Sequence, residues 1–80
     1  MDINGYQIRP SRHFALTLMR KWDYDIQDLR KAIQQPYKEV KIGKNKFEVY
    51  TQVKQKSRKL IFVKDDETKT IFIITGAEGS

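Results

Sequence analysis

Residues 46–75 read KFEVYTQVKQKSRKLIFVKDDETKTIFIIT, and this stretch decides the fold. Every second residue from 47 to 53 is apolar or threonine, which is the period-two pattern of a strand with one buried face. Two apolar runs follow, Leu60–Val63 and Ile71–Ile74, and polar turns at 54–58 and 65–69 separate the segments. Runs that are apolar at every position predict strands covered on both faces, or strands with one apolar face hidden by a partner.

The residues before this stretch predict one more strand and two helices. Alternation over 39–42 predicts the strand, and 43–45 form a turn. Ser11 is expected to cap a helix that ends near Trp22, because apolar residues recur there at steps of one, three and four. Asp25 is expected to cap a second helix, which ends before Pro36 because the residue preceding a proline avoids the α region.

Runs of helix followed by runs of strand predict an α+β fold, in which two N-terminal helices pack on an antiparallel sheet of three to four strands. We expect residues 1–80 to form a single domain. Residues 1–10 would be an N-terminal arm or an edge strand around Tyr6–Ile8. Residues 76–80 would be a flexible tail.

The composition excludes several classes of protein. There is no cysteine, so disulfides, thiolate metal ligands and thiol catalysis are excluded. The absence of disulfides in so small a chain favours a cytoplasmic location. The start of the chain shows no signal peptide, and no apolar run approaches the roughly 20 residues of a membrane span.

The positive charge is concentrated in the middle of the chain. Residues 38–59 contain eight basic and two acidic residues, which accounts for the whole net charge of +6. Clustered charge of one sign attracts polyanions, so RNA is the predicted partner, although a basic surface can also serve solubility alone. Tyr50 lies on the polar face of its predicted strand and is a candidate for base stacking. The predicted nucleic-acid-binding residues are Arg20, Lys41, Lys44, Lys46, Tyr50, Lys54, Lys56 and Lys59.

His13 is the one side chain with an ordinary pKa suited to proton transfer near neutral pH. On a helix it would share one side with Thr17, Arg20 and Lys21, a set that could hold and cleave a phosphodiester without a metal. The alternative is that His13 forms only local hydrogen bonds and that the cations are a solvated face. A multi-histidine metal site is excluded, and we expect neither a metal nor a cofactor.

Two segments, SRHFALTLMRKWDYDIQDLRKAIQQP and KLIFVKDDETKTIFIIT, resemble the opening and the ending of BrnT-like domains and the related RelE-like toxin superfamily. The resemblance implies a RelE-like fold and a metal-independent endoribonuclease toxin that a partner antitoxin neutralises. It implies His13 as acid or base, Lys21 and Arg58 as phosphate-holding groups, and Thr75 as a hydroxyl that orients one of them. Two alternatives stay open: a non-catalytic nucleic-acid-binding module, and a protein-interaction domain that forms a homodimer through its apolar strands.

Overall fold

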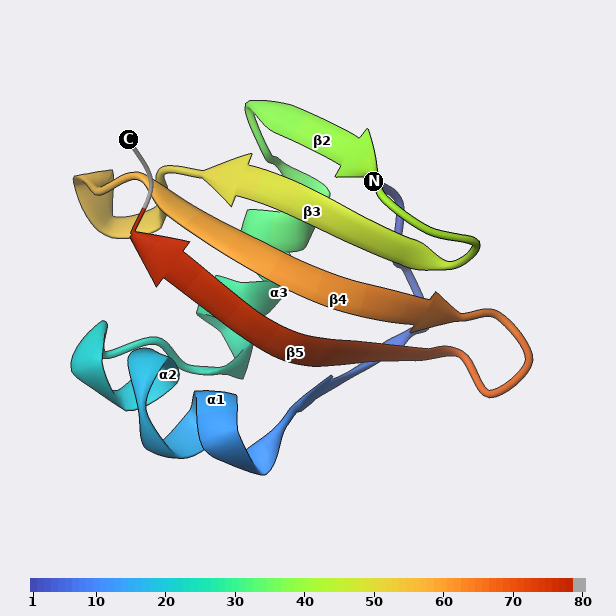
Figure 1. Ribbon diagram of the computed structural model, residues 1–80, viewed down its shortest axis with the longest axis horizontal. Coiled ribbons are helices and arrows are strands. Elements are labelled where there is room, and N and C mark those ends of the chain that lie inside the picture. Colours follow the sequence, from blue (N-terminus) through green and yellow to red (C-terminus); the bar gives the residue numbers. More distant parts are fainter. Residues whose placement is uncertain (79–80) are drawn as a thin grey trace.

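The computed structural model describes residues 1–78, which fold into one five-stranded sheet and three short helices (Figure 1). The elements follow one another as β1 (Gln7–Pro10), α1 (Arg12–Leu16), α2 (Leu18–Lys21), α3 (Ile26–Gln34), β2 (Lys38–Lys41), β3 (Lys46–Thr51), the 3-10 turn η1 (Val53–Gln55), β4 (Arg58–Asp65) and β5 (Thr70–Glu78).

The α+β class is confirmed, but the prediction of a wholly antiparallel sheet of three to four strands is wrong. The strand order is β1-β5-β4-β3-β2, and β1 runs parallel to β5 while the other neighbours are antiparallel. The fifth strand comes from the N-terminal arm. Ile8 lies opposite Ile71, and the backbone N–H of Gln7 donates to the carbonyl of Lys69 at 2.8 Å. This pairing joins segments that are far apart in the sequence, so the local pattern of residues 1–10 could not reveal it.

One face of the sheet holds the core. The helices lie on that side, with α3 behind the sheet in Figure 1. Alternate residues of the strands point toward them and are buried, as the period-two pattern of residues 47–51 predicts. The buried apolar side chains are Ile3, Ile8, Phe14, Trp22, Tyr24, Leu29, Ala32, Ile33, Val49, Val53, Leu60, Phe62, Ile71 and Ile73.

The first helix is interrupted, whereas the apolar stripe of residues 11–22 predicted a continuous one. Ser11 caps α1 as predicted, since its Oγ accepts from the backbone N–H of Phe14 at 3.1 Å. Thr17 then leaves the helical conformation, with φ −114° and ψ −88°, and its hydroxyl donates to the carbonyl of His13 at 2.6 Å. A threonine that bonds the carbonyl four residues back competes with the backbone and bends helices. The stripe therefore packs as two short helices.

Both ends of α3 match the prediction. The Asp25 carboxylate accepts from the backbone N–H of Asp28 at 2.8 Å, and the Asp28 carboxylate accepts from that of Asp25 at 3.0 Å, which forms a capping box. The Nζ of Lys54 lies 3.3 Å from Asp28 Oδ2. The hydrogen bond from the Asp25 backbone, together with Lys54, lowers the pKa of Asp28 below its usual value.

Asp28→Asn is expected to lower the free energy of unfolding at pH 7 by about 0.3–1 kcal/mol, because a carboxylate is lost from a helix N-terminus. A carboxyl whose pKa falls on folding stabilises the protein fully above its unfolded pKa of about 3.9. That stabilisation disappears as the pH falls through the folded pKa, so wild type and variant should converge in acid. Urea unfolding at a series of pH values measures this. Asp23→Asn, at a fully exposed carboxylate 3.9 Å from Lys54, is the matched control and should change little.

β5 is longer than expected. Gly76, Ala77 and Glu78 continue the strand and pair with Leu60, Lys59 and Arg58, so the prediction of a flexible tail from residue 76 is wrong for these three. Two contacts explain the extension. Gly76 leaves room for Trp22 and Phe14, and the Glu78 carboxylate accepts from the indole N–H of Trp22 at 3.1 Å. Residues 79 and 80 of the predicted tail lie outside the described part.

Candidate nucleic-acid interface

The second face of the sheet carries no helix in residues 1–78, and we call it the open face (Figure 1). A Cβ built on Gly76 would lie 3.1 Å from Trp22 and 3.2 Å from Phe14, so Gly76 faces the helices. Its neighbours Thr75 and Ala77 therefore point to the open face, because side chains alternate along a strand.

The strand pairing arranges the open face in cross-strand rows, in which neighbouring strands are about 4.8 Å apart. The first row is Arg9, Phe72, Val63 and Lys46, on β1, β5, β4 and β3. The second row is Ala77, Lys59, Tyr50 and Lys38, on β5, β4, β3 and β2. Between them lies a third row of Thr75, Ile61, Glu48 and Val40. The first two rows each contain one aromatic ring with cations on both sides.

Phe72 is the more exposed of the two rings in the open-face rows. The residue is 44% exposed, while Ile71 and Ile73 on either side are completely buried. Among residues 1–78, no aromatic ring or cation is paired with it. The ring is therefore free to stack on a flat ligand.

Phe72 was not identified from the sequence as a candidate binding residue, although the apolar run that contains it gave an indication. The run Ile71–Ile74 predicted a strand covered on both faces, or one with an apolar face hidden by a partner, and residues 1–78 have helices for one layer only. One set of side chains in that run therefore had to lie on the uncovered face. Arg9 was also missed, since its place beside Phe72 depends on the parallel pairing of β1 with β5.

Tyr50 lies on the open face as predicted, but its ring is already engaged. The Nζ of Lys38 is 5.2 Å from the ring centroid, and the ring of Tyr37 is 6.2 Å away. The Tyr50 hydroxyl donates to the Glu48 carboxylate, and this hydrogen bond raises the pKa of Tyr50 above its usual value. Tyr50 is therefore a less accessible stacking partner than Phe72.

The structure separates the predicted nucleic-acid-binding residues. Lys46, Tyr50 and Lys59 share the open face. Lys41 faces the other way with Phe47, and Lys54 reaches Asp23 and Asp28 beside the helices. The remaining three are Arg20 on α2, Lys44 in the turn between β2 and β3, and Lys56 after η1.

The predicted catalytic residues do not form one cluster in the described part of the chain. Lys21 and Arg58 both contact the Glu78 carboxylate, Lys21 at 3.8 Å, and Arg58 also lies 4.8 Å from the centroid of the Trp22 ring. Only 11% of the Arg58 side chain is exposed, and its Nε is buried without a hydrogen-bond partner. Thr75 points to the open face, on the opposite side of the sheet. His13 is exposed on α1, and within residues 1–78 its side chain has no hydrogen bond or ion pair with the other three.

A hollow opens beside Phe72 at the end of the sheet where β4 turns into β5. Its volume is about 510 Å³, within the range of small-ligand sites. The lining side chains are Arg9, Val63, Asp65, Thr68, Thr70 and Phe72. Arg9 gives the hollow a positively charged hydrogen-bond donor, and Asp65 gives it a negatively charged acceptor.

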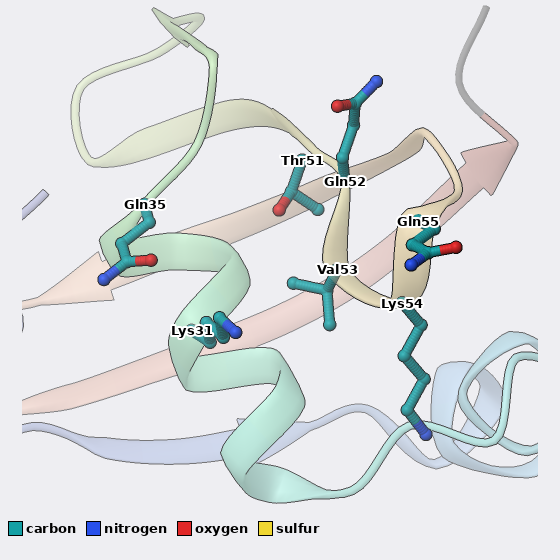
Figure 2. Close-up of a pocket in the computed structure, with 7 residues that line it drawn as sticks. All are labelled: Lys31, Gln35, Thr51, Gln52, Val53, Lys54 and Gln55. Atoms are coloured by element: carbon teal, nitrogen blue, oxygen red, sulfur yellow. The ribbon is translucent and has the colours of Figure 1, made fainter.

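A second hollow of about 330 Å³ lies between α3 and the end of β3. Figure 2 shows Thr51 and Val53 turned toward α3, while Lys54 extends away from the hollow. Lys54 is already paired with Asp23 and Asp28, so Lys31 is the remaining cation at this site. The other lining side chains, Gln35, Gln52 and Gln55, are uncharged amides. This hollow therefore offers less charge complementarity to RNA than the open face.

Within residues 1–78, no three histidine, aspartate or glutamate side chains lie close enough together to hold a metal ion. No helix of this part is both long and apolar enough to cross a membrane. Comparison of the chain with family models, curated proteins and solved structures gave no match, so the resemblance to RelE-like toxins stays a prediction.

Proposed function

We propose that the open face binds single-stranded RNA. The observation that carries this proposal is the pair of cross-strand rows in which an aromatic ring has cations on both sides, Arg9–Phe72–Val63–Lys46 and Lys59–Tyr50–Lys38. Unpaired bases stack on exposed aromatic side chains, and lysine and arginine beside the rings contact the phosphates.

The charges of the open face support this proposal. Among residues 1–78, Arg9, Lys46 and Lys59 take part in no ion pair, so no carboxylate has to be displaced before they contact a phosphate. By contrast, Glu78 holds Lys21 and Arg58 on the helical side. The cations of the open face are thus the ones available to a polyanion.

The shape of the face supports a single strand rather than a duplex. Phe72 stands at one end of the sheet and Tyr50 toward the other, two strands across and four residues along. That separation is about 16 Å from standard strand dimensions. A flexible strand of several nucleotides can place bases at both ends, whereas stacked bases inside a duplex present no free ring face.

Binding of a fluorescein-labelled U10 RNA is expected to weaken steeply as salt is raised. If the protein contacts three to four phosphates, a plot of log K for RNA association against log[salt] should have a slope of about −2 to −3 for a single strand. Lys59→Gln should weaken binding and make that slope shallower by about 0.7, because one phosphate contact is lost. Fluorescence anisotropy titrations between 50 and 300 mM KCl measure both quantities.

Lys31→Gln is the matched control, because Lys31 is an exposed lysine of α3 on the helical side. It should leave the slope nearly unchanged. Absence of U10 binding at low salt, or equal effects of the two substitutions, would contradict binding at the open face.

Cleavage by His13, Lys21, Arg58 and Thr75 stays a prediction, and the same mixtures test it. RNA that is cut in the presence of EDTA by wild type but not by His13→Ala would support an endoribonuclease. RNA that stays intact when it is saturated with the protein would indicate binding without cleavage. An antitoxin partner and a homodimer stay predictions as well.

A further inference from the structure

We infer that the hollow beside Phe72 binds a guanine base of the RNA strand. This inference rests on the proposed function, since it assigns a base preference to the same open face. It depends on three features of the hollow: an exposed ring, a carboxylate held in place by its own turn, and a free guanidinium.

The lining favours a base over a phosphate. Phe72 and Val63, adjacent on β5 and β4, give the hollow an apolar side on which a flat ring can pack. The Asp65 carboxylate repels a phosphate. A neutral base with N–H groups on its edge avoids that repulsion and satisfies the carboxylate.

Asp65 has a fixed orientation. Its Oδ1 accepts from the backbone N–H of Glu67 at 3.0 Å and of Thr68 at 3.2 Å, so the turn between β4 and β5 holds the carboxylate. Within residues 1–78, Oδ2 has no hydrogen-bond or ion-pair partner. A carboxylate held in this way presents acceptor positions and no donor to a ligand.

Guanine is the base whose edges match these groups. Its N1–H and N2–H₂ are adjacent donors on one edge, which a carboxylate can accept together. Its O6 and N7 are adjacent acceptors, which an arginine can contact with two N–H groups. Adenine and cytosine each offer a single exocyclic amino group beside an acceptor, and uracil offers one N–H between two carbonyls. Arg9, opposite Phe72 in the pairing of β1 with β5, supplies the guanidinium. At a guanine it would contact the base in place of a phosphate, which leaves the phosphates to Lys46 and Lys59.

The test compares four labelled RNAs, U9 and the three 9-mers that carry G, A or C at the central position. Anisotropy titrations at 100 mM KCl give their dissociation constants. We expect the G-containing strand to bind about tenfold more tightly than U9, toward the low end of the discrimination that one bidentate contact gives. The A- and C-containing strands should stay within about threefold of U9, because each lacks the second adjacent donor.

Inosine at the central position tests the carboxylate contact with the protein unchanged. It differs from guanine by the loss of the N2 amino group. It should therefore bind closer to U9 than to the G-containing strand. Inosine binding as tightly as guanine would show that Asp65 does not read this edge and would overturn the inference.

Asp65→Asn tests the same contact from the side of the protein. Asparagine keeps an Oδ1 acceptor for the backbone of the turn and places an NH₂ donor where Oδ2 stood. The preference for guanine should fall from about tenfold to about twofold, while binding of U9 should not weaken. Glu67→Gln is the matched control, because it removes the same charge from the same turn at a residue that does not line the hollow. The Glu67→Gln variant should keep the preference for guanine.

The two proposals fail in different ways. If none of the four RNAs binds, RNA binding by this chain is wrong, and the base preference fails with it. If all four bind equally and Lys59→Gln weakens each of them, RNA binds the open face and the guanine site is wrong. If the preference persists in Asp65→Asn to the same degree as in Glu67→Gln, guanine is read elsewhere and the inference is overturned.

Discussion

Phe72→Ala is expected to weaken binding of U10 by about 5- to 160-fold, because stacking of one base on an aromatic side chain is worth about 1–3 kcal/mol. Phe72 is the ring of the open face that has no partner in residues 1–78, so its removal deletes a stacking surface that Tyr50 does not replace. Anisotropy titrations of wild type and variant at 100 mM KCl measure the change. The variant should stay folded, since Phe72 is already 44% exposed.

Leu16→Ala is the matched control for Phe72→Ala. Leu16 ends α1 on the helical side and is 56% exposed, so this variant also removes an exposed apolar side chain. Its affinity for U10 should equal that of wild type. An unchanged affinity in Phe72→Ala, with a melting temperature close to that of wild type, would exclude stacking on β5.

Gly76→Ala should be the most destabilising of the substitutions proposed for this chain. A Cβ at this position would lie 2.6 Å from the backbone carbonyl oxygen of Lys59, and it would also approach Trp22 and Phe14. The carbonyl belongs to the paired strand β4, so it cannot move without disturbing the pairing of Leu60 with Gly76. Overpacking of this kind costs about 1–3 kcal/mol. Thermal unfolding should show a midpoint lower by roughly 5–20 °C for a domain of this size.

Gly43→Ala separates this clash from the general effect of replacing a glycine. Its Cβ would meet the side chain of Lys46 at 3.2 Å, in the exposed turn between β2 and β3. The turn can shift by a few tenths of an ångström, so the midpoint should change by only a few degrees. A Gly76→Ala protein as stable as Gly43→Ala would contradict the close approach of Gly76 to the Lys59 carbonyl and the two aromatic rings.

Local signals in the sequence predicted the local structure well. The cap at Ser11, the cap at Asp25 and the end of α3 before Pro36 each depend on a few neighbouring residues, and all three are confirmed. The alternation over 47–53 also assigned the faces of β3 correctly, because a strand buried on one side has a fixed period, although β3 ends at Thr51 and the buried Val53 belongs to η1. These features need no knowledge of the rest of the chain.

Most of the features that failed depend on distant partners, whereas the break of the first helix at Thr17 has a local cause. The parallel pairing of β1 with β5 and the contacts of Glu78 with Arg58 and Trp22 join residues far apart in the sequence. The periodicity of the apolar residues indicated neither this pairing nor these contacts. The same limit applies to the candidate site. Arg58 was expected to hold a phosphate, and it lies instead against Trp22, where the length of β5 brings a carboxylate to it.

The parallel pairing of β1 with β5 also sets the order in which the protein can be assembled. β5 lies between β1 and β4 in the sheet, yet it is synthesised after the other four strands. A nascent chain that ends before Thr70 has no partner for β1 and lacks the core side chains Ile71 and Ile73. Bringing β1 and β5 together closes the long loop between them, and this costs conformational entropy before their contacts form, which slows folding. Until β5 has been synthesised, the helices of the emerging chain therefore have only part of a core to cover.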